Sequence, residues 1–144
     1  MRLFLDTSVM LSASASVKGA SRELFRLAPS NHWLLVTTPY AIDEVLRHLP
    51  DFPAQASADW DALRSSILIM DDVVTVNLPV VFPAAKDKPI LFGALAWADV
   101  LLTLDQGDFG PMLGGSFYGL PVLKPGKFLE RERGAGRLRS ASQP

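Results

Sequence analysis

The stretch LFLDTSVMLSA, residues 3–13, decides the fold of this chain. Its first three residues are continuously apolar, which is typical of a strand buried on both faces of a parallel sheet, and the run stops at Asp6. Similar apolar runs recur at residues 33–36, 73–76 and 100–104, and a weaker one at 121–123. Segments with helical spacing separate these runs. Alternating strands and helices predict an α/β layered fold with a mostly parallel sheet.

The helical segments carry recognisable start signals. Thr38 followed by Pro39 predicts an N-cap and a first-turn proline for a helix that Pro50 ends. Asp87 starts another helix, and further helices are expected over residues 51–70, entered through Pro53, and over residues 125–133. The expected buried stripes are Ile42, Val45, Leu46 and Leu49 after Thr38, and Ile90, Leu91, Ala94 and Leu95 after Asp87. Residues 106–119 are rich in glycine, which predicts a loop beside the end of a strand.

Length and composition indicate one soluble domain. The 144 residues suffice for a core without disulfides, and the absence of cysteine excludes a thiolate zinc site and a cysteine nucleophile. The first residues lack the design of a signal peptide, and no apolar run reaches the roughly 20 residues that span a bilayer. We therefore expect no membrane association and a cytoplasmic location, with the bacterial cytosol as the default.

Charge is distributed unevenly along the chain. Residues 1–123 carry 8 basic and 13 acidic side chains, whereas residues 124–144 carry 6 basic and 2 acidic ones. The net charge is thus about −5 for residues 1–123 and about +4 for residues 124–144 at neutral pH. Residues 1–133 are expected to form the domain. Residues 134–144 are expected to be a disordered basic tail, because they lack apolar content.

Carboxylates stand where two of the expected strands end. Asp6 follows the first strand and Asp105 follows the run at residues 100–104. In a parallel sheet both side chains emerge at the carboxyl edge, where open α/β sheets bind their ligands. Neighbouring strands lie about 4.8 Å apart, so the two carboxylates could share a cation if their strands are neighbours.

Two further acids lie at a helix start or on a helix, and the first of them, Asp87, is expected at the same edge. Asp87 lies at a helix start that follows a loop, and Glu44 lies in the second turn of the helix that begins near Pro39. Oxygen ligands without cysteine suit a hard cation such as Mg²⁺ or Mn²⁺. Such ions activate water and neutralise charge on a transferring phosphoryl group.

Three blocks of this sequence resemble the acidic blocks of PIN-domain ribonucleases. They are LFLDTSVMLSA at residues 3–13, TPYAIDEVLRHL at 38–49 and KDKPILFGALAWADVLLTLDQGDF at 86–109, in the family's order, and the resemblance covers nearly all of residues 1–130. It implies a three-layer α/β/α sandwich with a parallel sheet of about five strands, and RNA cleavage with Mg²⁺ or Mn²⁺. The positions that match the family's acids are Asp6, Glu44, Asp87 and Asp105, with metal ligation assigned to Asp6, Asp87 and Asp105.

The resemblance also implies supporting positions and partners. Ser8 and Thr103 match small polar positions that support the acidic cluster, and Asp108 is a candidate fifth acid. Many family members of this size are toxins of toxin–antitoxin pairs, so a small antitoxin protein and a homodimer are expected in addition to an RNA substrate. The family often has acids just before the Asp87 position, whereas this chain has Ala84, Ala85 and Lys86 there.

Each acid also has an ordinary structural interpretation. Asp6 could close a strand and bond the following turn, and Asp87 could be a simple helix N-cap. On a helical wheel Glu44 lies nearly opposite the apolar stripe of its helix, as a solvated side chain would, and only the resemblance selects it. His32 and His48 have no recognisable nucleophile partner and are assigned no role.

Two functional hypotheses follow from these residues. The first is a metal-dependent endoribonuclease, for which the resemblance implies the role of the toxin in a toxin–antitoxin pair. The second is a PIN-like module that binds RNA or protein and has an impaired metal site, which the altered neighbourhood of Asp87 and the position of Glu44 keep open. A phosphohydrolase with Asp6 as its nucleophile is disfavoured, because Ser8 replaces the usual second acid two residues on.

Overall fold

The fold was obtained as a computed structural model, in which residues 1–74 and 85–141 are described. Their strands are β1 (Arg2–Leu5), β2 (Leu34–Thr37), β3 (Ile67–Ile69), β4 (Val100–Leu102), β5 (Ser116–Phe117) and β6 (Leu120–Leu123). Their α-helices are α1 (Thr7–Ala15), α2 (Ala20–Asn31), α3 (Pro39–His48), α4 (Ala54–Arg64), α5 (Lys88–Trp97) and α6 (Pro125–Gly134). Short 3₁₀ turns are η1 (Leu49–Asp51), η2 (Ala85–Asp87) and η3 (Gly110–Met112).

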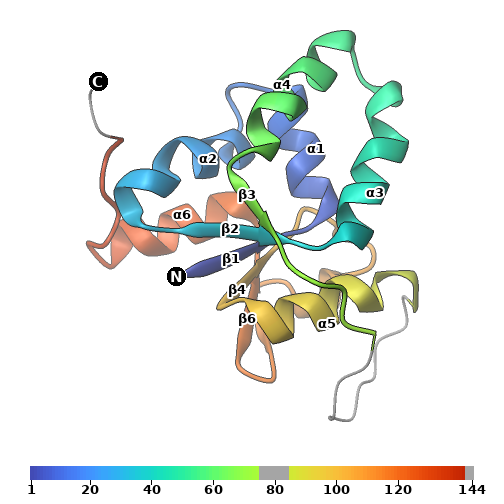
Figure 1. Cartoon of the computed structure of the whole chain (residues 1–144). Helices are drawn as coiled ribbons and strands as arrows, with labels where there is room; N and C mark the ends of the chain where they lie inside the picture. The colour runs from blue at the N-terminus through green and yellow to red at the C-terminus, as the bar shows by residue number, and fades with distance from the viewer. Residues whose placement is uncertain (75–84, 142–144) are drawn as a thin grey trace.

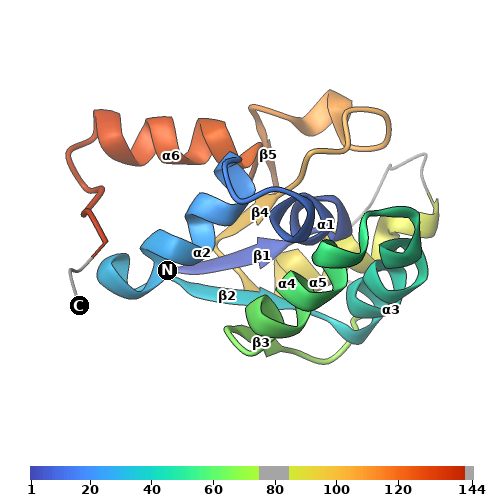
Figure 2. The same cartoon turned by 90° about the horizontal axis from the view of Figure 1, so that it is seen from above.

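The six strands form one sheet in the order β3-β2-β1-β4-β6-β5. All neighbouring strands are parallel except β5 and β6, which form an antiparallel pair at one edge. The α5 helix covers one face of the sheet and α1 and α2 cover the other (Figure 1). Seen from above, α6 lies alongside α2 (Figure 2), and the two helices are in contact. The fold is therefore the predicted α/β/α arrangement with a mostly parallel sheet.

The order of the strands reverses between β1 and β4. Strands β1, β2 and β3 follow one another toward one edge of the sheet, and the chain then crosses back to place β4 on the other side of β1. Leu5 pairs with Leu102 in this register, so the two strands end at the same level. A parallel sheet binds ligands at such a switch point, beyond the carboxyl ends of its strands.

The core explains why β1 reads as a continuous apolar run. Leu3, Phe4 and Leu5 are all fully buried because helices cover both faces of the strand. The α5 helix comes close to β1 at Gly93, where an added Cβ would lie 3.2 Å from the ring of Phe4 and 3.1 Å from Cγ2 of Thr38. Glycine at this position lets the helix pack closely on the central strand.

Three details of the sequence-based prediction are wrong. The third strand was expected at residues 73–76, but β3 is Ile67–Ile69, within the stretch expected to be helical. Residues 73 and 74 are irregular, and residues 75 and 76 lie outside the described residues. The α4 helix ends at Arg64, and the apolar run after it pairs with β2. The six strands of the sheet agree with the expected number of about five, and the short β5 lies within the expected loop. Leu46 is 54% exposed, and Ala41 joins the buried stripe of α3 in its place.

The last described residues run back along α2. Asn31, at the end of α2, donates to the backbone oxygen of Arg139 and accepts from its backbone nitrogen, each at 2.8 Å. Arg137 pairs with the buried Glu132 of α6. The tail was predicted to be disordered, and residues 137–139 of it have these contacts. None of the helices in the described ranges is long and apolar enough to cross a bilayer.

Candidate metal centre

The carboxyl ends of β1 and β4 bring the predicted acids together. The backbone nitrogen of Asp6 donates to the carbonyl oxygen of Leu102 at 3.0 Å, which ties the residue after β1 to the last residue of β4. Thr103 and Leu104 then carry the chain to Asp105. Asp6 and Asp105 were expected to lie close enough to share a cation if their strands are neighbours, and β1 and β4 are neighbours.

Asp6 is buried and held by three donors. One of its oxygens, Oδ1, accepts from the backbone nitrogen of Thr7 at 2.8 Å. The other, Oδ2, accepts from Oγ of Ser8 at 2.8 Å and from Oγ1 of Thr103 at 2.7 Å. Burial raises the pKa of the Asp6 carboxyl, and these hydrogen bonds partly offset that rise. The hydrogen bonds from Ser8 and Thr103 therefore orient this carboxylate.

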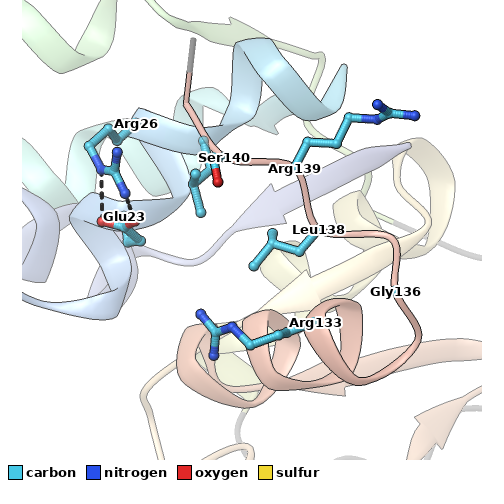
Figure 3. Close-up of a pocket in the computed structure, with 8 residues that line it drawn as sticks. Glu23, Arg26, Arg133, Gly136, Leu138, Arg139 and Ser140 are labelled. Atoms are coloured by element: carbon cyan, nitrogen blue, oxygen red, sulfur yellow. Dashed lines mark hydrogen bonds and ion pairs between the residues drawn. The ribbon is translucent and has the colours of Figure 1, made fainter. Parts of the chain in front are cut away.

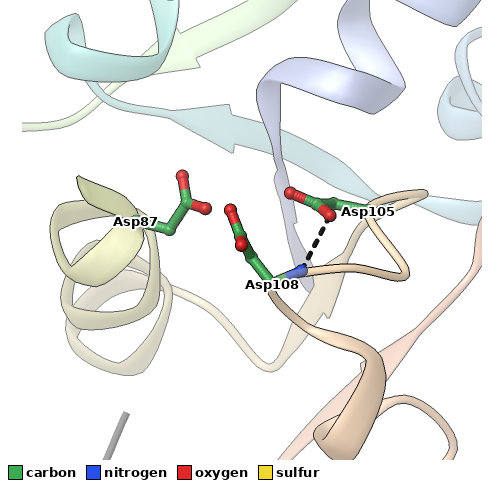
Figure 4. Close-up of side chains that lie close together, drawn as sticks. All are labelled: Asp87, Asp105 and Asp108. Carbon is green, nitrogen blue, oxygen red and sulfur yellow. Dashed lines mark hydrogen bonds between the residues drawn. The ribbon is translucent and has the colours of Figure 1, made fainter. Parts of the chain in front are cut away.

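Asp105 and Asp108 are joined by a turn. The Oδ1 atom of Asp105 accepts from the backbone nitrogen of Asp108 at 2.9 Å, and the backbone nitrogen of Asp105 donates to Oγ1 of Thr103 at 3.0 Å. This turn places both carboxylates on the same side of the loop, facing the start of α5 (Figure 4). The i, i+3 spacing in LDQGDF was the sequence signal for a paired role of Asp108, which was assigned only a supporting one.

Asp87 is at the N-cap position of α5, but its side chain forms no capping hydrogen bond. Its Oδ2 atom is buried and has no hydrogen-bond partner among the described residues. Burial, followed by a hydrogen bond with Asp108 and the negative charges of Asp6, Asp108 and Glu44, raises the pKa of the Asp87 carboxyl to about 8. The simple capping interpretation therefore does not account for this side chain.

Asp87, Asp105 and Asp108 converge on one point. Each offers a carboxylate oxygen, and the three oxygens lie within 4.8 Å of one another (Figure 4). Like charges at this separation repel, and a buried oxygen without a partner is costly. A divalent cation with a preference for oxygen ligands would relieve both, so the donor set fits Mg²⁺ or Mn²⁺.

Glu44 lines a pocket at the carboxyl ends of β1 and β4. This pocket, of ≈ 180 Å³, is also lined by Asp6, Asp87 and Asp105. Glu44 is half-buried, and its Oε1 atom accepts from Oγ1 of Thr7 at 3.3 Å, whereas the neighbouring Asp43 is exposed. The helical-wheel interpretation of Glu44 as a fully solvated side chain therefore does not hold.

Lys86 also lines this pocket, and sequence reasoning assigned no functional role to it. Its Nζ atom lies 3.5 Å from Oδ2 of Asp108, and its pKa is raised first by the charge of Asp108 and then by that of Asp87. Tyr40 of α3 donates from its hydroxyl to the backbone oxygen of Lys86, which anchors the backbone at this position. The lysine adds a positive charge to the pocket wall beside the acids.

Comparisons with known proteins support the fold. No family model matches the sequence, and no curated protein does. Among solved structures, the chain is similar to a chain in the crystal structure of VapBC2 from Rickettsia felis bound to a DNA fragment from their promoter. The TM-score is 0.59 at 15% sequence identity, and the match covers 85% of this chain and 97% of that chain. Similarity at this level of identity shows the fold alone, and the fold is PIN-like.

Proposed function

We propose that this protein is a divalent-metal-dependent nuclease that hydrolyses RNA phosphodiester bonds at the pocket between β1, β4 and α5. The observation that carries the proposal is the convergence of Asp87, Asp105 and Asp108, whose oxygens lie within 4.8 Å of one another at the switch point of the sheet. The unpartnered oxygen of Asp87 and the PIN-like fold support it independently.

The side chains of the pocket have distinct roles in this proposal. Asp87, Asp105 and Asp108 hold the cation, and Asp6 lies beside them with its carboxyl group oriented by Ser8 and Thr103. Bound Mg²⁺ or Mn²⁺ supplies positive charge that offsets the charge developing on the phosphoryl group, and it activates water for attack. Glu44 forms the wall of the pocket on the α3 side. It is not one of the three acids whose oxygens lie within 4.8 Å of one another.

The proposed substrate and partners rest on the resemblance of the sequence to PIN-domain ribonucleases. An RNA strand is the proposed substrate, because the PIN-type blocks of the sequence place Asp6, Glu44, Asp87 and Asp105 in the family's acidic positions. The similar chain in the VapBC2 structure belongs to a complex. We therefore propose a toxin role with a small antitoxin partner, a homodimeric assembly and a cytoplasmic location.

A second candidate function is favoured by Lys86. Its ammonium group lies 3.5 Å from Asp108, where it competes with a divalent cation for the same carboxylate. The three hydrogen bonds of Asp6 also occupy part of the lone-pair capacity that a metal would use. A PIN-like module that binds RNA or protein without cleaving it is therefore the alternative.

RNA cleavage with and without chelator separates the two functions. The purified protein is incubated with a structured RNA in Mg²⁺, Mn²⁺ or EDTA, and the products are mapped. Cleavage that requires metal, survives in Asp43→Asn and is lost in Asp105→Asn supports the nuclease. Asp43 is the matched control because it is an exposed acid of α3 next to Glu44. RNA binding without cleavage in either metal supports the binding module.

A further inference from the structure

A second pocket lies far from the acids, between α2, α6 and the tail. It encloses ≈ 300 Å³ and is lined by Glu23 and Arg26 of α2, by Arg133 of α6, and by Leu138 and Arg139 of the tail. The α2 helix ends just before β2 begins, so this pocket lies at the amino ends of the strands. Figure 1 shows the tail and the N-terminus at one end of the molecule and the start of α5 at the other.

Specific contacts build the wall that the tail contributes. The two hydrogen bonds between Asn31 and the backbone of Arg139, each 2.8 Å long, attach the tail to α2. Arg137 donates from Nε to Oε2 of Glu132 at 2.6 Å, which attaches the tail to α6. Leu138, between these two attachments, packs against the core. Residues 137–139 are therefore attached by backbone and buried contacts, and these contacts do not involve the side chain of Arg139.

The charge of the pocket is positive. It contains three arginines and one acid, Glu23, which forms a two-bonded fork with Arg26. Within the described ranges, neither Arg133 nor Arg139 pairs with a carboxylate. Arg133 is near enough for its charge to act on Glu23, whereas the guanidinium of Arg139 points outward and away from this pair (Figure 3). The positive charges thus extend from the pocket to its outer rim.

We propose that this pocket binds phosphate groups of a nucleic-acid strand, with Arg26 and Arg133 contacting one phosphate and Arg139 contacting the next. The guanidinium fork matches the geometry of phosphate oxygens better than an ammonium group does. The spread of the arginines from the pocket to its rim suits a polyanion rather than a single anion. The acidic body of the chain repels such a strand elsewhere in the absence of metal.

The site does not depend on catalysis, so its test is carried out in EDTA. Binding of a short fluorescent single-stranded oligoribonucleotide is measured by anisotropy between about 50 and 200 mM salt. The test variant is R133Q/R139Q, and the charge-matched control is K18Q/R64Q, which removes two exposed cations outside the pocket. Inorganic phosphate is titrated in parallel by NMR to separate a strand from a free phosphate group. Thermal unfolding confirms that each variant folds.

Removal of arginines is expected to weaken oligonucleotide binding, and removal of the acid Glu23 is expected to strengthen it. R133Q/R139Q weakens oligonucleotide binding by about tenfold, the equivalent of one charge-assisted hydrogen bond, and reduces the slope of log K against log salt by about 1.4 for a single strand. E23Q, which removes the competing carboxylate, tightens binding. Phosphate shifts confined to this pocket, without an oligonucleotide effect, support the same site with a free phosphate as its ligand. Equal binding by the wild type, R133Q/R139Q and K18Q/R64Q, with no phosphate shifts at Arg133, overturns the proposal. Because no cleavage is measured, that result leaves the proposed nuclease untouched.

Discussion

Thr103 donates a 2.7 Å hydrogen bond from Oγ1 to Oδ2 of Asp6 and accepts a 3.0 Å hydrogen bond from the backbone nitrogen of Asp105. One fully buried hydroxyl thereby sets the positions of two acids that lie 99 residues apart in the chain. The relationship exists because β1 and β4 are parallel neighbours that end at the same level. The geometry of the candidate centre therefore depends on a side chain that need not touch the metal.

Replacing Thr103 tests this dependence. Thr103→Val keeps the shape of the side chain but removes both hydrogen bonds, so Mn²⁺ affinity is expected to fall by about 10- to 100-fold, as is typical for groups that orient metal ligands. Thr103→Ser retains the hydroxyl and serves as the control. The measurement is a calorimetric Mn²⁺ titration of each variant. Equal affinities for Thr103→Val and the wild type would show that Thr103 does not orient the centre.

The raised pKa of Asp87 predicts a pH-dependent stability in metal-free protein. The pKa rises from its ordinary value of 3.8 to about 8, so the protonated carboxyl contributes stability that is complete below pH 3.8 and is lost as the pH rises through about 8. Asp87→Asn stays neutral throughout. In EDTA, its melting temperature should exceed that of the wild type increasingly from about pH 4 to pH 8.

Thermal unfolding scans at several pH values check this expectation. Added Mn²⁺ should raise the melting temperature of the wild type at pH 8, because the ion favours the ionised carboxylates. Asp87→Asn should gain much less from the ion. A difference between wild type and variant that stays constant across the pH range would contradict the raised pKa of Asp87.

Lys86 should weaken the binding of metal. Its ammonium group lies 3.5 Å from Asp108, but the side chain is 74% exposed, so the interaction is strongly screened. Lys86→Gln is therefore expected to increase Mn²⁺ affinity only modestly, by up to about fivefold. Lys88→Gln, which removes the lysine two residues further on at the start of α5, is the control. Weaker Mn²⁺ binding by Lys86→Gln would assign the lysine a supporting role instead.

Gly93 tests the packing that places α5 against β1. In Gly93→Ala the new Cβ would lie 3.2 Å from the buried ring of Phe4, which cannot move freely. The expected loss is about 1–3 kcal/mol in the free energy of unfolding, measured in urea. Gly134→Ala meets no atom within 4 Å and should change stability little. Equal stability of Gly93→Ala and the wild type would mean that the helix and strand are less tightly packed at this position.

The parts of the fold that could be predicted are those that local chemistry determines. A continuous apolar run that ends at an acid indicated β1 and Asp6, and the Thr38-Pro39 pair marked the start of α3. The position of β3 could not be derived, because a short apolar run after a helix reads equally well as more helix. Only its pairing with Leu35 in β2 identifies Ile67 as a strand residue.

The candidate site shows the same division. Asp6 and Asp105 were selected by strand-end position, which the sequence displays directly. The convergence of Asp108 with Asp87 depends on the turn after Asp105 and on where α5 begins, and neither is visible in residue spacing alone. Lys86 was noted only as a departure from an acidic pattern, since the reach of its side chain to Asp108 is a tertiary contact.

The central claim is that Asp87, Asp105 and Asp108 together hold one divalent cation, and Mn²⁺ binding followed by electron paramagnetic resonance tests it most directly. The wild type should bind Mn²⁺ and release it to EDTA. Asp105→Asn and Asp108→Asn should each lose at least about tenfold in affinity, while the exposed-acid control Asp43→Asn should bind as the wild type does. Absence of Mn²⁺ binding by the folded wild type, or equal binding by all four proteins, would contradict it.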